Sequence, residues 1–177
     1  MRAVFLDRDG VINRASVRDG KPYPPTRVED VDILPGVREA LRRLKDSAFR
    51  LIVVTNQPDI ARGALTAQDV DAIDEFLMRE LPLDRVYVCP HDCAQGCSCR
   101  KPRPGLLMLA AEHFGIDLRT SYMVGDRWRD IEAGRAAGCK TFFVDYQYDE
   151  RQPERPDYIV ASLADAAAII LSTNTPI

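Results

Sequence analysis

Residues 3–10 read Ala-Val-Phe-Leu-Asp-Arg-Asp-Gly, an apolar run that ends abruptly in two carboxylates, Asp7 and Asp9. An apolar run without alternation is typical of a strand that is covered on both faces, as strands are in parallel sheets. Ligands of such sheets gather at the carboxyl ends of the strands. The stretch therefore predicts a buried first strand that presents Asp7 and Asp9 to a ligand, with Gly10 permitting an unusual backbone turn after them.

The same order of apolar run, polar loop and amphipathic helix continues along the chain. Further strands are expected at 51–54, 86–88, 122–124, 141–144 and 158–160, and helices at 36–46, from Thr66, at 104–114, 129–137 and 162–171. This alternation predicts an α/β fold with a doubly wound, mainly parallel, Rossmann-like sheet. We expect one domain over residues 1–177, an irregular flap at 11–32, an exposed connection at 146–157 and a frayed tail at 172–177.

Composition narrows the class of protein. The chain has 177 residues, 46% of them apolar and 29% charged, and a net charge of −3. This acidic balance argues against a nucleic-acid surface, which usually needs a basic stripe. The longest apolar runs fall short of the ~20 residues of a membrane helix. Charged residues interrupt the N-terminal apolar stretch too early for a secretory signal, so we expect a cytoplasmic protein with no membrane partner.

The two acids after the first strand have a chemical and an ordinary explanation. An aspartate can be the nucleophile of phosphoryl transfer, and a second carboxyl can protonate the leaving oxygen and later deprotonate water. Asp7 and Asp9 are only two residues apart, so one can face the phosphorus while the other faces the leaving group. Taken alone, however, two acids in such a short motif are more often a solvated turn.

Polar side chains follow the other predicted strands as well. Thr55 ends the second strand and offers a hydroxyl for a phosphoryl oxygen, while Lys101 follows the cysteine-rich loop and offers positive charge. Asp126, directly after the strand at 122–124, suits Mg²⁺, and Asp130 follows it by about one helical turn. Each alone has a simpler explanation, such as a solvated lysine or a helix N-cap at Asp126. Together they predict a phosphoryl-transfer site at one edge of the sheet.

Four potential metal ligands lie close together in the loop at 89–101. Cys89, His91, Cys97 and Cys99 form a Cys-x-His-x₅-Cys-x-Cys pattern. Three thiolates and one imidazole complete a tetrahedral structural zinc site, whereas free buried cysteines are the alternative. We expect the zinc clip to hold the next residues, Arg100 and Lys101, near a bound phosphate. The spare cysteines are Cys93, which could replace one of the four ligands or have no role, and Cys139, which is expected in the core.

Four ordered motifs resemble those of the haloacid dehalogenase superfamily: Asp-Arg-Asp-Gly at 7–10, Thr-Asn-Gln at 55–57, Lys-Pro at 101–102 and Gly-Asp-x-x-x-Asp at 125–130. The resemblance implies a capless fold of that type and a Mg²⁺-dependent phosphatase that forms an aspartyl-phosphate. It makes Asp7 the nucleophile, Asp9 the general acid–base, and Thr55 and Lys101 stabilisers of the phosphoryl group. The implied Mg²⁺ ligands are Asp7, the backbone carbonyl of Asp9, and Asp126, supported by Asp130.

Three features resemble a narrower branch of phosphatases: the zinc loop, the run Thr-Asn-Gln-Pro-Asp-Ile-Ala-Arg-Gly at 55–63, and the run Arg-Lys-Pro-Arg-Pro-Gly at 100–105. That branch acts on D-glycero-D-manno-heptose 1,7-bisphosphate, at the 7-phosphate, or on histidinol phosphate. The heptose enzymes share more of these features and imply heptose supply for lipopolysaccharide, a phosphorylated sugar as the small-molecule partner, and a monomer. On this resemblance the substrate-binding residues are Asn56, Gln57, Arg100 and Arg127.

Two alternatives stay open. Only five residues separate His91 from Cys97, a spacing that also occurs in the histidinol-phosphate branch. A catalytically silent, zinc-bearing binding protein on the same fold is the alternative from a different class.

Overall fold

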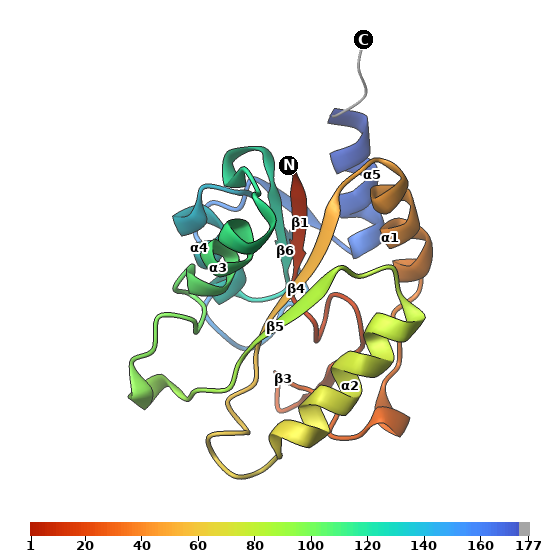
Figure 1. Cartoon of the computed structure of the whole chain (residues 1–177). Coiled ribbons are helices and arrows are strands. Elements are labelled where there is room, and N and C mark those ends of the chain that lie inside the picture. The colour runs from red at the N-terminus through yellow and green to blue at the C-terminus, as the bar shows by residue number, and fades with distance from the viewer. Residues whose placement is uncertain (174–177) are drawn as a thin grey trace.

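The computed structural model describes residues 1–173 and contains one six-stranded parallel sheet (Figure 1). The strand order is β5-β4-β1-β6-β7-β8, and every neighbouring pair is parallel. The first strand of the chain therefore lies in the middle of the sheet, between β4 and β6. The strands are β1 (Ala3–Leu6), β4 (Arg50–Asn56), β5 (Arg85–Cys89), β6 (Tyr122–Gly125), β7 (Lys140–Val144) and β8 (Tyr158–Val160).

Helices cover both faces of this sheet, which confirms the predicted doubly wound α/β architecture (Figure 1). Helices α1 and α5 pack against each other on one face, and α3 and α4 lie on the other. The helices are α1 (Val37–Asp46), α2 (Ala67–Glu80), α3 (Gly105–Phe114), α4 (Trp128–Ala137) and α5 (Leu163–Thr173). Three short 3₁₀ turns occur at η1 (Val28–Asp30), η2 (Cys93–Gln95) and η3 (Leu118–Thr120).

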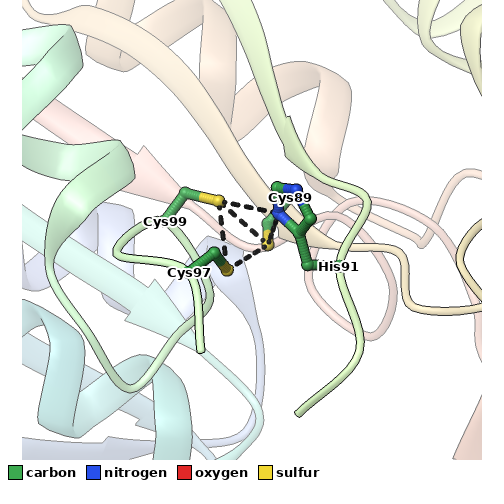
Figure 2. Close-up of side chains that lie close together, drawn as sticks. All are labelled: Cys89, His91, Cys97 and Cys99. Carbon is green, nitrogen blue, oxygen red and sulfur yellow. Dashed lines mark hydrogen bonds between the residues drawn. The ribbon is translucent and has the colours of Figure 1, made fainter. Parts of the chain in front are cut away.

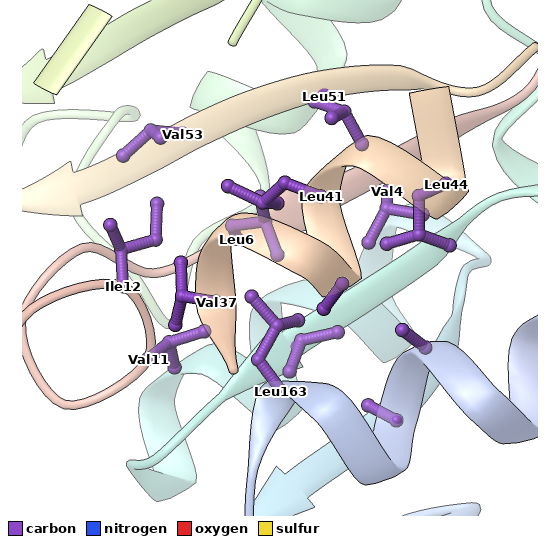
Figure 3. Close-up of a cluster of buried hydrophobic side chains, with 14 of the residues drawn as sticks. Val4, Leu6, Val11, Ile12, Val37, Leu41, Leu44, Leu51, Val53 and Leu163 are labelled. Atoms are coloured by element: carbon purple, nitrogen blue, oxygen red, sulfur yellow. The ribbon is translucent and has the colours of Figure 1, made fainter. Parts of the chain in front are cut away.

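The central strands supply side chains alternately to two hydrophobic layers. Val4 and Leu6 of β1 pack with α1 and α5 (Figure 3), whereas Phe5 packs with α3 on the opposite face. All three are completely buried. Because successive side chains of a strand point to opposite faces, a strand between two helix layers must be apolar throughout. This requirement explains the unbroken apolar run from which the fold is predicted.

The segment at 11–32 is more regular than the expected flap. It contains an antiparallel hairpin of β2 (Ser16–Arg18) and β3 (Lys21–Tyr23). The two turn residues, Asp19 and Gly20, both have positive φ, at 49° and 71°. This is the backbone of a type I′ hairpin turn, for which Asp-Gly is a favoured pair. The Asp149 N–H donates to the Gly20 carbonyl at 2.9 Å, which attaches the hairpin to the connection at 146–157.

Two further predictions concern the ends of the molecule and the membrane. The expected frayed tail is wrong at residues 172 and 173, which belong to α5, and its remaining residues, 174–177, lie outside the described part of the chain. Within residues 1–173, no helix has both the length and the apolar character required to cross a bilayer.

Candidate active site

The parallel sheet brings the carboxyl ends of β1, β4 and β6 to one edge. Asp7 follows β1, Thr55 lies at the end of β4, and Asp126 follows β6. A pocket of about 260 Å³ opens at this edge. It is lined by Asp7, Asp9, Ala15, Pro22, Tyr23, Pro24, Thr55, Asn56, Pro58, Asp59, Arg62, Arg100, Lys101, Arg127, Arg129 and Asp130. Position at a strand end, the basis of the sequence prediction, thus assembles most of the expected residues.

Three carboxylates and one ammonium form the buried floor of the site. Asp7, Asp126 and Asp130 each offer an oxygen, and these atoms all lie within 4.8 Å of one another. Lys101 Nζ donates to Asp7 Oδ1 at 2.8 Å and lies 2.6 Å from Asp130 Oδ1. Its third contact is the Val54 carbonyl, at 2.7 Å. Lys101 therefore reaches the nucleophile candidate through a fully engaged, fixed ammonium.

Asp126 is the least satisfied of these groups. Neither of its buried carboxylate oxygens has a hydrogen-bond partner among the described residues. Burial, followed by the charges of Asp7 and Asp130, raises the pKa of Asp126 well above its usual value, while the nearby Tyr148 hydroxyl opposes this. Burial and Asp130 likewise raise the pKa of Asp7 to about 6, against the lowering effect of Lys101. Clustered, under-satisfied carboxylate oxygens are the donor set that a hard divalent cation prefers.

The alternative role of Asp126 as a helix N-cap is wrong. Helix α4 begins at Trp128, and its first turn is capped by Asp130, whose carboxylate accepts the Arg127 N–H at 3.0 Å. Asp130 thus supports the site in two ways, because the same carboxylate also pairs with Lys101.

Gly10 allows Asp126 to approach the loop after β1. Its φ of +92° belongs to the left-handed region that side chains disfavour. A Cβ at this position would lie only 2.0 Å from Asp126 Oδ2. The glycine that ends the first motif is therefore required by contact with the carboxylate of the fourth motif, as well as by the local turn.

Asp9, the candidate acid–base, is held by three donors. Asn13 Nδ2 donates to its Oδ1 at 2.9 Å, and Gln57 Nε2 donates to its Oδ2 at 2.8 Å. The third donor is the guanidinium of Arg8, at 3.2–3.3 Å. The carboxylate of a residue on an irregular loop is thereby fixed from several directions.

Gln57 lies in a different place from the one predicted. It was expected to bind substrate, but its side chain is buried and does not line the pocket. Its amide nitrogen is engaged by Asp9 and, at 3.0 Å, by the Thr55 hydroxyl. Gln57 thus contacts two candidate catalytic residues instead of the ligand space. Asn56 does line the pocket, and it also exchanges two hydrogen bonds of 3.1 Å with the backbone of Lys101.

The cysteine-rich loop brings its four predicted ligands together (Figure 2). The three sulfur atoms lie 3.2–3.6 Å apart, and His91 Nδ1 lies 3.3 Å from Cys99 Sγ and 3.6 Å from Cys89 Sγ. Around tetrahedral zinc, with bonds of ~2.3 Å to sulfur, sulfur atoms lie about 3.8 Å apart, so a small outward movement of the side chains would let the donor set hold such an ion. The cluster can therefore hold a metal with no open position.

The remaining cysteines are not part of this cluster. Cys93 is exposed on the short turn η2, whereas Cys139 is buried in the core, as predicted. Arg100 follows the last ligand, lines the pocket, and donates to the His91 carbonyl at 3.0 Å. The loop thus connects directly to the pocket through Arg100 and Lys101.

Arginines at the rim of the pocket include some that the sequence did not single out. Arg127 was predicted, and the Glu150 carboxylate accepts hydrogen bonds from both Nε and NH2 of its guanidinium. Arg62 and Arg129 were missed, although both line the pocket. Arg129 lies in the first turn of α4, which faces the strand ends, and this position was the available signal. The buried Nε atoms of Arg100 and Arg129 have no hydrogen-bond partner within residues 1–173.

Comparison with known proteins agrees with this geometry. A family model described as HAD-hydrolase-like matches residues 98–166. The D-glycero-beta-D-manno-heptose-1,7-bisphosphate 7-phosphatase of Escherichia coli strain K12 is 36% identical, over 98% of this chain and 96% of its own length. The enzyme of the same name from Yersinia pestis is 38% identical, over 78% of this chain and 77% of its own.

A solved structure shares the fold along its whole length. The D,D-heptose 1,7-bisphosphate phosphatase of B. bronchiseptica, crystallised with magnesium and phosphate, superposes with a TM-score of 0.84 at 31% identity. The match covers 98% of this chain and 99% of that one.

Proposed function

Since the chain belongs to the haloacid dehalogenase-like phosphatases, in the family of the heptose-1,7-bisphosphate 7-phosphatases, we propose that it removes the 7-phosphate of D-glycero-D-manno-heptose 1,7-bisphosphate through an aspartyl-phosphate on Asp7. The observation that carries this proposal is the floor of the pocket. There, Asp7, Asp126 and Asp130 lie within 4.8 Å of one another, and Lys101 bonds to Asp7.

Asp7 is the nucleophile and Asp9 the proton carrier in this proposal. The Asp7 carboxylate attacks phosphorus, and the bond from phosphorus to the sugar oxygen breaks while Asp9 gives that oxygen a proton. Asp9 then accepts a proton from the water that hydrolyses the aspartyl-phosphate. Thr55 and Lys101 hold phosphoryl oxygens. Lys101 suits this role because its ammonium lies beside Asp7, at 2.8 Å, and it would exchange one of its three present contacts for a phosphoryl oxygen.

Mg²⁺ is the cation proposed for the acidic floor, held by Asp7, the Asp9 carbonyl and Asp126, with Asp130 in support. The Asp126 oxygens, which no residue within 1–173 meets at hydrogen-bond distance, and the raised pKa values of Asp7 and Asp126 support a cation there. When bound, Mg²⁺ supplies charge neutralisation and orientation of the phosphate oxygens.

Zinc is the ion proposed for Cys89, His91, Cys97 and Cys99, and its role is structural. The four donor atoms are mutually close enough for one ion, which leaves no position for substrate. A closed clip at the base of this loop restricts Arg100 and Lys101, which follow Cys99 directly.

A second anionic group on the substrate is favoured by the arginines of the rim. Arg100 and Arg129 line the pocket, and the buried Nε of each has no hydrogen-bond partner among the described residues. A guanidinium suits the bidentate recognition of a phosphate. We therefore propose Arg129 as a substrate-binding residue beside Asn56, Arg100 and Arg127, in place of Gln57. A monomer in the cytoplasm stays a prediction.

A substrate panel tests the proposed function. Phosphate release is measured with Mg²⁺ for both anomers of the heptose bisphosphate, for histidinol phosphate and for 4-nitrophenyl phosphate. The heptose ester should have a kcat/KM roughly 100-fold or more above the others, as binding through a second phosphate implies. If the enzyme preferred histidinol phosphate, that ester would replace the heptose bisphosphate as the proposed substrate. Turnover of no ester, or a fully active Asp7→Asn variant, would overturn the phosphatase mechanism.

A further inference from the structure

A fully buried arginine connects helix α2 with the candidate acid–base. Arg8 is 0% exposed, and its guanidinium bonds to two carboxylates from different segments. One is Asp9. The other is Asp74, 66 residues away on α2, which accepts from Arg8 NH1 at 2.9 Å. Asp74 is itself only 7% exposed, and the proposed reaction gives it no role.

Asp74 occupies a position where α2 would otherwise be apolar. The buried face of this helix consists of Val70, Ile73, Asp74 and Leu77, the spacing of a core-facing stripe. A carboxylate there is unfavourable unless it is paired and hydrogen-bonded. Burial raises the pKa of Asp74 and Arg8 opposes that shift, as expected for a pair enclosed by the core. Because the cost of desolvating a buried ion pair offsets its attraction, the Arg8–Asp74 pair contributes little net stability. A role in function therefore has to come from the other contact of Arg8, the one with Asp9.

We propose that Asp74 is a positioning residue that acts through Arg8 to fix the Asp9 carboxylate for proton transfer, an inference that rests on the proposed function. Arg8 has a long side chain, and Asp74 holds one branch of its fork while Nε and NH2 hold Asp9. Ile73 and Leu77, on either side of Asp74 along α2, are both completely buried in the core. The anchor of Arg8 is therefore rigid.

The other two donors to Asp9 do not replace this anchor. Asn13 and Gln57 each bond to one carboxylate oxygen, at 2.9 and 2.8 Å, whereas the Arg8 fork contacts both. Without Asp74, Arg8 would keep its charge but lose the contact that sets its direction. Asp9 would then be held less firmly, and the step that suffers is the proton transfer to the leaving oxygen.

The test compares two leaving groups. Departure of a sugar alkoxide needs a proton, whereas 4-nitrophenolate leaves without one. Because kcat/KM includes only steps up to the first irreversible one, its value for 4-nitrophenyl phosphate is insensitive to a general acid. Asp74→Asn keeps an acceptor of the same shape, and Asp74→Ala removes it. Asp71→Asn, on the exposed side of the same helix, is the matched control for the change of charge.

Asp74→Asn should lower kcat/KM for the heptose ester roughly tenfold. Asp74→Ala should lower it more, up to the ~10²–10⁴-fold that general acid catalysis contributes. The nitrophenyl ester should change less than about threefold for the Asn variant, and Asp71→Asn should change neither. Equal losses on both esters, or no loss, would overturn the inference. If Asp74→Ala does not fold, the Asn variant decides alone.

The Asp9→Asn variant separates this inference from the proposed function. If Asp9→Asn loses the heptose reaction selectively and Asp74→Asn does not, only the role of Asp74 fails. If Asp9→Asn loses both esters alike, the acid–base assignment is wrong, and the role of Asp74 is overturned with it.

Discussion

Substituting Gly10 by alanine tests the contact between the first and the fourth motif. The new Cβ would face two separate costs. A φ of +92° disfavours any side chain by about 1–2 kcal/mol, and the Cβ would lie 2.0 Å from Asp126 Oδ2 and 2.6 Å from Asp126 Cγ. Since real contacts of this kind exceed ~3 Å, the carboxylate or the loop must move by about 1 Å, and displacement on that scale can cost about 10²-fold in rate.

Gly138 provides the matched control. It ends α4 with a φ of +86°, and the nearest atom to an added Cβ is the flexible Arg119 Cγ, at 4.0 Å. Gly138→Ala should therefore lower the free energy of unfolding by about 1–2 kcal/mol, equivalent to roughly 2–8 °C in Tm, with activity unchanged. Gly10→Ala should lose more stability than this and about 10²-fold in kcat/KM.

Thermal unfolding and Mg²⁺-dependent phosphate release measure the two effects. If Gly10→Ala loses no more stability than Gly138→Ala and keeps its activity, Asp126 does not approach Gly10 as described, and the carboxylate floor of the site is wrong.

Three further predictions concern the zinc loop, a buried carboxylate and a helix cap. Removing zinc with a zinc-selective chelator should lower kcat/KM without removing the proposed Mg²⁺ ligands, because Arg100 and Lys101 loosen. Full activity in folded, zinc-free protein would contradict the clip. Cys93→Ser should keep both metal and activity. Burial acts to raise the pKa of Asp84, but the Leu51 N–H and the cations of Lys45 and Arg50 hold it below its usual value. The contribution of Asp84 to the stability of the folded protein is therefore complete above the unfolded pKa of ~3.9 and fades as the pH falls through the folded pKa. Asp84→Asn should lower the free energy of unfolding by ~1.5–3 kcal/mol at neutral pH and by less in acid, as measured by urea denaturation. Thr66→Ala removes the acceptor of the Asp69 N–H and should cost about 1 kcal/mol, whereas Gln68→Ala on the same helix should cost almost nothing.

The sheet was predictable because its physical requirement is local. A central strand such as Ala3–Leu6 lies between two helix layers and is apolar at every position, so its run is visible without knowledge of its neighbours. The edge strand Tyr158–Val160 is also an apolar run, although its Ile159 is exposed. The hairpin was missed because its strands have three residues each and are mostly exposed, which leaves no apolar pattern. Asp19-Gly20 was its one local signal.

The site was predictable where position in the fold determines proximity. Asp7, Thr55 and Asp126 meet because parallel strands end at one edge. The partnership of Arg8 and Asp74 follows from no such rule, since it depends on how α2 packs beneath that edge. Gln57 shows the same limit: its place in the motif was correct, but the direction of its side chain, toward Asp9 and away from the pocket, is a result of packing.

The charges of the site connect its floor with its rim. The buried ammonium of Lys101 pairs with Asp7 and Asp130, which leaves two of the three negative charges of Asp7, Asp126 and Asp130 uncompensated if all three carboxylates are ionised. Uncompensated negative charge is unfavourable in a protein interior, so the carboxylates either become protonated or bind a cation. The raised pKa values of Asp7 and Asp126 reflect the preference for the protonated form. On the proposed function, a bound divalent cation would match the deficit, and a phosphate dianion would then meet a floor with no net charge to repel it. Further attraction must come from the rim, where Glu150 already neutralises Arg127. On the proposed function, we therefore expect affinity for a second phosphate to depend on Arg100 and Arg129, whose buried Nε atoms have no hydrogen-bond partner within residues 1–173.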